Sequence, residues 1–209
     1  MDISVVVLAI GSIALATGAV LLWRMQSSGG GGHASITIAD MFSASLTLTP
    51  ADTAQAKEAV RTAEAKRGTA PTNAEVPRLV DSTTTFARVL WVDDEPDNNL
   101  FETIALEKLG KFVTKATSTE AALDYLERMD FTILITDLGR HGDPDAGLNL
   151  IRNLRAHGQR LPIVIYTVDA SPMREIALAA GADAVVDLPG PLIREVESRV
   201  SRVGQEVMN

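Results

Sequence analysis

Residues 88–96, with the sequence RVLWVDDEP, constrain the fold more than any other part of this chain. Their apolar and β-branched side chains stop at two adjacent carboxylates, Asp93 and Asp94. This pattern is typical of a buried parallel strand that ends at the carboxyl edge of an open α/β sheet, where such sheets bind their ligands. Two neighbouring like charges are costly to desolvate unless a positive charge lies close to them. The simplest candidate is a divalent cation that prefers oxygen ligands, such as Mg²⁺.

Strand-like and helix-like segments alternate after this first strand. Further strand patterns occur at residues 112–116, 132–136, 162–166 and 184–186, and helical patterns at residues 97–109, 118–129, 146–157, 172–180 and 191–203. Five strands interleaved with five helices predict an α/β fold with a doubly wound parallel sheet and right-handed crossovers. We expect this domain to span residues 86–203, followed by a tail at residues 204–209.

Two more of these strands end on side chains that suit phosphoryl chemistry. The third strand ends at Asp137 and the fourth at Thr167, and in such a sheet both ends neighbour the end of the first strand. Asp137 is the candidate nucleophile, because carboxylates can form aspartyl phosphates. Asp94 and Asp137 are the candidate Mg²⁺ ligands. Asp93 would act through water, and the Gly139 carbonyl is a further candidate ligand. Thr167 would donate a hydrogen bond to a phosphoryl oxygen.

The segments VDDE, ITDLGR and IVIYTVDAS, followed by GADAVVDLP, resemble the receiver domain of two-component response regulators. The resemblance covers about residues 86–203. It implies a flavodoxin-like fold with the strand order 2-1-3-4-5. It also implies a signalling module, not an enzyme, in which a histidine kinase or a small phosphodonor phosphorylates Asp137 with the help of Mg²⁺. Phosphorylation would then change the binding of protein partners.

The sequence departs from the family pattern at several positions. The family has a lysine at the position of Leu188, and its aromatic switch position matches Val185. The loop at residues 138–147 is also longer than usual. Arg140 or His141 in this loop could supply the missing positive charge, although an exposed loop position is the simpler interpretation of both.

Two interpretations of function therefore stay open. The intact aspartates and Thr167 favour a receiver that binds Mg²⁺ and accepts a phosphoryl group. Leu188 and Val185 favour a phosphorylation-independent scaffold that recruits a cytoplasmic partner to the membrane. A phosphatase-type enzyme on a similar sheet is disfavoured, because Gly139 stands where such an enzyme needs an acid. With no output domain expected after the last helix, output would depend on protein association.

The N-terminal residues 1–24 predict a transmembrane anchor. Residues 3–23 contain no charged side chain, and as a helix rising about 1.5 Å per residue they would cross a hydrocarbon core of roughly 30 Å. Arg24 follows directly, so the positive-inside rule places the C-terminal domain in the cytoplasm of a single-pass inner-membrane protein. A cleaved signal peptide is the alternative, but a positive n-region is lacking. Ala14 and Gly18 could seat a helix contact in a homo-oligomer.

Three segments separate this anchor from the α/β domain. Residues 25–34 are rich in Gly and Ser and predict a flexible linker. Residues 35–67 predict a short strand and then a helix that begins at Thr49 and Pro50. Because that helix is rich in alanine and charge, we interpret it as a spacer in preference to a self-association element. Residues 68–85, rich in Thr and Pro, predict a second linker.

Composition excludes several classes of function. The chain of 209 residues has a formal net charge of -8, which argues against a basic face for nucleic acid. It contains no cysteine, so a disulfide scaffold, a thiolate zinc site and a cysteine nucleophile are excluded.

Overall fold

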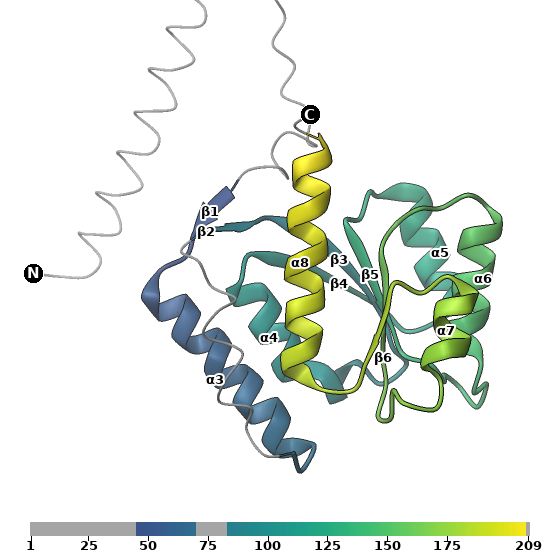
Figure 1. Ribbon diagram of the computed structural model, residues 1–209, viewed down its shortest axis with the longest axis horizontal. Coiled ribbons are helices and arrows are strands. Elements are labelled where there is room, and N and C mark those ends of the chain that lie inside the picture. Colours follow the sequence, from purple (N-terminus) through teal and green to yellow (C-terminus); the bar gives the residue numbers. More distant parts are fainter. Residues whose placement is uncertain (1–44, 70–82, 208–209) are drawn as a thin grey trace, which may run out of the picture. The chain divides into compact units, whose positions relative to one another are not determined.

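The computed structural model describes residues 45–69 and 83–207, which all belong to one compact unit (Figure 1). The predicted anchor at residues 3–23, the linker at residues 25–34 and most of the linker at residues 68–85 lie outside the described residues. None of the helices in the described ranges is both long and apolar enough to cross a membrane.

A five-stranded parallel sheet forms the centre of the molecule. Its strands are β3 (Ala87–Val92), β4 (Lys111–Ala116), β5 (Ile133–Thr136), β6 (Ile163–Tyr166) and β7 (Ala184–Val186). They lie in the order β4-β3-β5-β6-β7, which confirms the predicted order 2-1-3-4-5. In the register of the sheet, Val92 at the end of β3 is opposite Thr136 at the end of β5. The residues that follow these two strands are therefore brought to the same edge.

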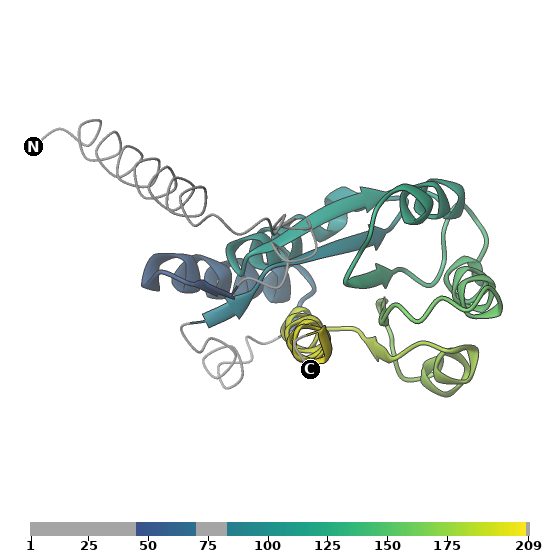
Figure 2. The same cartoon turned by 90° about the horizontal axis from the view of Figure 1, so that it is seen from above.

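Helices cover both faces of this sheet (Figures 1 and 2). The short η2 (Pro96–Asn99), α4 (Leu100–Lys108) and α8 (Pro189–Val207) follow β3 and β7, and α4 and α8 pack on one face with Trp91 and Ile135. On the other face, α5 (Thr119–Arg128), α6 (Ala146–Ala156) and α7 (Arg174–Ala180) pack with Leu90 and Leu134. Alternate strand residues thus enter separate cores, as expected for a strand buried on both faces. Because α8 continues to Val207, most of the predicted tail is helical.

A second, two-stranded sheet precedes this domain. Strand β1 (Ser45–Thr47) pairs antiparallel with β2 (Thr83–Thr85), with Leu46 opposite Thr84. We predicted a linker up to residue 85, but its last three residues form β2. These residues are all threonine, and β-branched side chains favour extended backbone.

Helix α3 (Pro50–Lys66) begins as predicted, because the Thr49 side chain accepts a hydrogen bond from the Asp52 N–H at 3.1 Å and Pro50 takes the first helical position. The helix packs against α4 and α8, so the spacer interpretation is wrong (Figure 1). Its buried residues are Ala56, Ala59, Val60, Ala63 and Glu64. Alanine side chains let two helix backbones approach closely, and a helix with one large apolar residue can therefore still bury a face.

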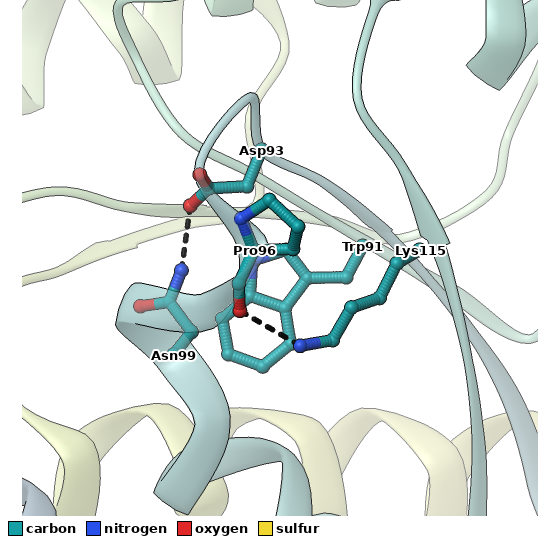
Figure 3. A pocket seen from close by; sticks show the side chains of 5 residues that line it. All are labelled: Trp91, Asp93, Pro96, Asn99 and Lys115. Atoms are coloured by element: carbon teal, nitrogen blue, oxygen red, sulfur yellow. Dashed lines mark hydrogen bonds between the residues drawn. The ribbon is translucent and has the colours of Figure 1, made fainter.

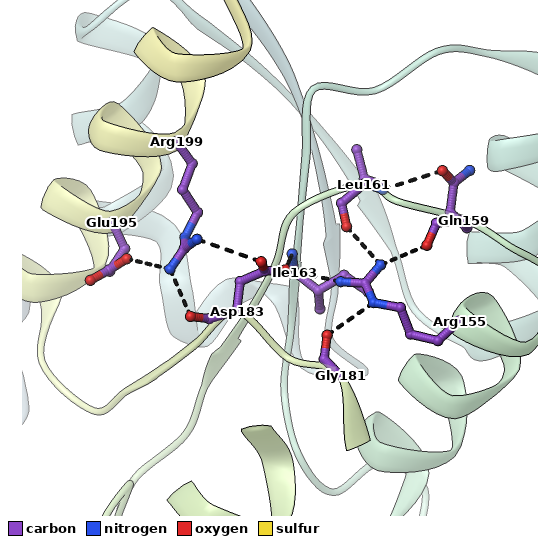
Figure 4. Close-up of polar contacts among 8 residues, drawn as sticks. All are labelled: Arg155, Gln159, Leu161, Ile163, Gly181, Asp183, Glu195 and Arg199. Carbon is purple, nitrogen blue, oxygen red and sulfur yellow. Dashed lines mark hydrogen bonds and ion pairs between the residues drawn. The ribbon is translucent and has the colours of Figure 1, made fainter. Parts of the chain in front are cut away.

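Polar contacts around Asp183 hold the edge of the sheet at which β6 and β7 begin (Figure 4). Asp183 Oδ2 accepts hydrogen bonds from the Ile163 N–H at 2.8 Å and from Arg155 Nη2 at 2.9 Å. Arg199 Nη2 donates to the Asp183 carbonyl at 2.7 Å. These contacts join α6, α8 and the start of β6, and they give the acidic Asp183 a structural role.

Candidate functional site

The four strand-end residues predicted to form the site lie at one edge of the sheet. Asp93 and Asp94 follow β3, Asp137 follows β5 and Thr167 follows β6. The ladder of backbone hydrogen bonds continues through them, since the Asp137 N–H donates to the Val92 carbonyl at 3.0 Å. The Thr167 N–H likewise donates to the carbonyl at the end of β7, at 3.1 Å. The backbone of the site is therefore held by the sheet itself.

Asp93 is buried and bound by its own loop (Figure 3). Its Oδ1 accepts a hydrogen bond from the Glu95 N–H at 2.8 Å, and its Oδ2 accepts one from Asn99 Nδ2 at 2.6 Å. Lys115 lines the same small pocket, and its Nζ donates to the Pro96 carbonyl at 2.8 Å. Asp93 therefore shapes the loop after β3 with both of its carboxylate oxygens.

Asp94 contacts the loop that follows Asp137. Its Oδ2 accepts a hydrogen bond from the His141 N–H at 2.7 Å and lies 3.5 Å from His141 Nδ1. His141 has a φ of 49°, in the left-handed region that few residues adopt, and its side chain is 63% exposed. The interpretation of His141 as an exposed loop residue agrees with this position, and the residue also binds a predicted metal ligand.

Asp137 is half-buried at the centre of the edge. Its Oδ1 accepts a hydrogen bond from the Leu138 N–H at 2.6 Å, and within the described chain its Oδ2 accepts none. Burial raises the pKa of Asp137, and the charges of Asp93 and Asp94 raise it further against the opposing effects of the Leu138 N–H and Arg140. The carboxylate thus keeps one oxygen for an incoming group.

Arg140 is buried, so the interpretation of this residue as exposed is wrong. Its Nη1 donates to Thr136 Oγ1 at 2.6 Å and to the Asp137 carbonyl at 2.9 Å, and its Nη2 donates to Thr119 Oγ1 at 3.0 Å. The loop turns back because the backbones of Arg140 and Asp143 exchange two hydrogen bonds of 2.9 Å. A fixed positive charge therefore lies beside the carboxylates.

The oxygen donors at this edge suit Mg²⁺. In the described ranges, no group of three or more His, Asp or Glu side chains is arranged so that the side chains alone could hold a metal ion. Mg²⁺ commonly binds proteins through one or two carboxylates and keeps several of its waters. Asp94 and Asp137 each have a carboxylate oxygen outside the described hydrogen bonds, and the Gly139 carbonyl follows in the same loop. These three groups fit the ion as direct ligands, whereas both oxygens of Asp93 accept hydrogen bonds from its own loop.

The edge near β7 differs from the family pattern, as the sequence indicated. Val185 is fully buried and Leu188 is half-buried. The basic group that reaches this edge is Arg67, the residue after α3: its Nη1 donates to the Asp187 carbonyl at 2.8 Å and to the Thr167 carbonyl at 3.4 Å. Sequence reasoning missed Arg67, because nothing in the local pattern links it to residues about a hundred positions away.

Comparisons with known proteins agree with this fold. Residues 89–191 match the family model of the response regulator receiver domain. The two-component response regulator PhoP of Pseudomonas aeruginosa is 32% identical over 115 residues, which cover 54% of this chain and 50% of PhoP. The chain thus spans about half the length of this curated relative.

Two solved structures show the same fold. The receiver domain of a Francisella response regulator is 21% identical, with a TM-score of 0.51, over 56% of this chain and 98% of that one. A putative response regulator from Chloroflexus aurantiacus is 24% identical, with a TM-score of 0.51, over 56% of this chain and 99% of that one.

Proposed function

Because residues 89–191 match the family model of the response regulator receiver domain, we propose that this chain is a membrane-tethered signalling protein that accepts a phosphoryl group on Asp137. The observation that carries the proposal is the Asp137 carboxylate itself. One of its oxygens is fixed by the Leu138 N–H, and the other is outside the described hydrogen bonds. It is flanked by two further aspartates and by the buried cation of Arg140.

The transfer needs one bond to form and one to break. Asp137 Oδ2 attacks the phosphorus of a histidine kinase phosphohistidine or of a small acyl phosphate. An O–P bond forms, and the P–N or P–O bond of the donor breaks, with its electron pair leaving on the donor nitrogen or oxygen. The Thr167 hydroxyl donates a hydrogen bond to a phosphoryl oxygen. When Mg²⁺ is bound by Asp94, Asp137 and the Gly139 carbonyl, it offsets the negative charge of the phosphoryl group.

Arg140 supplies positive charge near Asp137, whereas Leu188, at the position of the family lysine, has none. Its guanidinium stays protonated in proteins and lies on the side of β5 that faces α5. It acts on the phosphoryl group through its field, because its described hydrogen bonds go to the protein. In this role it holds the loop of residues 138–147 and lowers the charge repulsion among the aspartates.

The experiment that tests this function is phosphate-affinity gel mobility of the detergent-solubilised full chain, incubated with Mg²⁺ and acetyl phosphate. We expect a shifted band that is lost in Asp137→Asn and in the presence of EDTA. Circular dichroism of Asp137→Asn checks that the variant is folded. Absence of a shift in the folded wild-type chain would contradict phosphorylation.

Leu188 and Val185 favour a second candidate, a scaffold that works without phosphorylation. Neither side chain can pair with a phosphoryl group or act as an aromatic switch at this edge. In this case partner capture by the wild type and by Asp137→Asn would be equal, whether or not the bait was treated with acetyl phosphate. A partner that binds only the treated wild type would exclude the scaffold.

We also propose that residues 3–23 anchor the chain in the inner membrane, with the receiver in the cytoplasm. The support is the uncharged apolar run and the flanking Arg24. The test is alkaline extraction of membranes that contain the full chain or a variant lacking residues 1–24. We expect only the full chain to stay in the membrane pellet. Chemical cross-linking of the full chain with and without Gly18→Leu would test a homo-oligomer formed through this segment.

A further inference from the structure

Arg67 joins the ends of two strands next to the candidate site. A single nitrogen, Nη1, donates to the carbonyl of Asp187 after β7 and reaches the carbonyl of Thr167 after β6. The Ala170 N–H contacts Asp187 Oδ2 at 3.5 Å, so the loop after β6 is tied to the same residue. The backbone of Thr167, the candidate hydrogen-bond donor to the phosphoryl group, is therefore held from the side of α3.

The guanidinium of Arg67 is itself fixed by groups on α4 and β6. It lies over the Tyr166 ring, with its central carbon 4.2 Å from the ring centroid, and its Nε is 3.7 Å from Glu102 Oε1. The Tyr166 hydroxyl donates to the same Glu102 oxygen at 2.7 Å. Glu102 is 2% exposed, so Arg67 is the cation that compensates a buried carboxylate. Arg67 is therefore held in one position.

The docking of α3 also depends on a close approach to α8. A Cβ atom added to Gly190, in the first turn of α8, would lie 3.3 Å from Glu64 Oε1. Glu64 is buried, and the neighbouring alanines of α3 are buried with it. The helix thus fits one place on α4 and α8, and this fit brings Arg67 to the strand ends.

We propose that Arg67 is a positioning residue of the phosphoacceptor site, supplied by α3 from outside the segment that matches the receiver family. This inference rests on the proposed function. By holding the Thr167 and Asp187 carbonyls, Arg67 sets where the Thr167 hydroxyl lies and how the chain enters the turn at Leu188. The coupling between ligand binding and the docking of α3 is reciprocal, because linkage requires each event to change the equilibrium constant of the other by the same factor. A phosphoryl group that fixes Thr167 therefore strengthens the docking of α3.

The test compares Glu102→Gln with the double variant Arg67→Met/Glu102→Gln in the full chain. Glutamine removes the buried charge that Arg67 would leave unpaired, so the two variants differ only in the arginine. The probe is beryllofluoride with Mg²⁺, measured by isothermal titration calorimetry. We expect the double variant to bind it about 5- to 10-fold more weakly than Glu102→Gln. Lys66→Met is the matched control with unchanged affinity, because the described contact of Lys66 is with the Phe101 ring, at 4.5 Å from its centroid.

Hydrogen exchange supplies a readout that a merely structural arginine would not change. In the wild type, beryllofluoride with Mg²⁺ should slow amide exchange in α3 by about the same factor as the affinity loss. In the double variant this effect of the ligand should disappear. Equal affinities of the two variants would overturn the inference. So would amide exchange rates in α3 of the wild type that are the same with and without the ligand.

Two further outcomes stay distinguishable. If the wild type neither binds beryllofluoride nor becomes phosphorylated, the proposed function fails and this inference fails with it. If α3 loses its protection in the double variant without ligand, Arg67→Lys replaces the double variant in the test. Lysine keeps the charge but lacks the planar fork in which Nε faces Glu102 while Nη1 reaches the two carbonyls. Wild-type affinity in Arg67→Lys would then refute the positioning role.

Discussion

Gly147 is the position where one added methyl group tests how the loop after β5 is built. It lies in the first turn of α6, and its N–H donates to the Leu138 carbonyl at 2.7 Å. A Cβ atom there would collide with the Asp137 carbonyl oxygen and would lie 3.0 Å from Leu138 Cα and 3.1 Å from the Leu138 carbonyl oxygen. All three are backbone atoms, so the collision cannot be relieved by rotating a side chain. In Gly147→Ala the segment that carries Asp137 must move.

The expected cost follows from two opposing effects. Overpacking costs about 1–3 kcal/mol, and alanine in a helix regains about 0.5–1 kcal/mol over glycine. We therefore expect Gly147→Ala to lower the free energy of unfolding by about 1–2 kcal/mol, which corresponds to a Tm lower by roughly 3–6 °C. The assay is urea and thermal unfolding followed by far-UV circular dichroism.

Gly139→Ala is the matched control for stability, because it adds the same methyl group to the same loop. Its Cβ atom would meet only ordinary contacts, the nearest at 3.5 Å from Pro144 Cα. We expect its free energy of unfolding to stay within about 0.5 kcal/mol of the wild type. If Gly147→Ala proved as stable as Gly139→Ala, the close packing of α6 on the Asp137 backbone would be refuted.

Four other single variants test buried charged or polar side chains. Lys111 Nζ lies 2.6 Å from Glu197 Oε1, so Lys111→Met and Glu197→Gln should each cost about 3–5 kcal/mol in urea unfolding, and the double variant less than their sum. Additive losses would contradict the pairing. Arg140→Met removes a cation that lowers the pKa of Asp137, so ¹³C NMR titration should show this pKa raised further, and an unchanged value would exclude the coupling. The pKa of Tyr166 is raised above its usual value of about 10 by burial and Glu102. Above about pH 10 the tyrosine releases its proton in the unfolded chain but keeps it in the folded one. The free energy of unfolding of the wild type, relative to that of Tyr166→Phe, should therefore fall by about 1.4 kcal/mol per pH unit. A difference that stays constant with pH would contradict burial of the hydroxyl.

The sheet and its acidic edge were predictable because both follow from local patterns. Apolar runs of four to six residues that stop at Asp93 or Asp137 indicate parallel strands and where they end. The order of such strands is limited by right-handed crossovers, so neighbouring strand ends could be inferred without any side-chain detail. Thr167 could be placed at the same edge because it directly follows the apolar strand β6.

The packing of α3 and the place of Arg140 were not predictable in this way. Hydrophobic periodicity gives little weight to alanine, so a helix that buries Ala56 and Ala63 looks like a solvated spacer. The burial of Arg140 depends on a turn closed by backbone hydrogen bonds to Asp143. No local pattern in the sequence marks such a turn, and charge alone favoured exposure.

In the proposed function, the buried Arg140 and the partly buried Arg67 take different parts in a site that has Leu188. In the family a lysine at that position brings positive charge to the phosphoryl group, and the chain cannot regain that charge from β7. Arg140 brings a cation to the face of β5 that is covered by α5. Arg67, whose charge is compensated by Glu102, instead holds the strand-end carbonyls from the opposite face. Each is anchored by hydrogen bonds to backbone carbonyls, so each fixes the geometry of a loop as well as its charge. Because Arg67 directly follows α3, the site in the proposed function includes a residue that precedes the first strand of the five-stranded sheet.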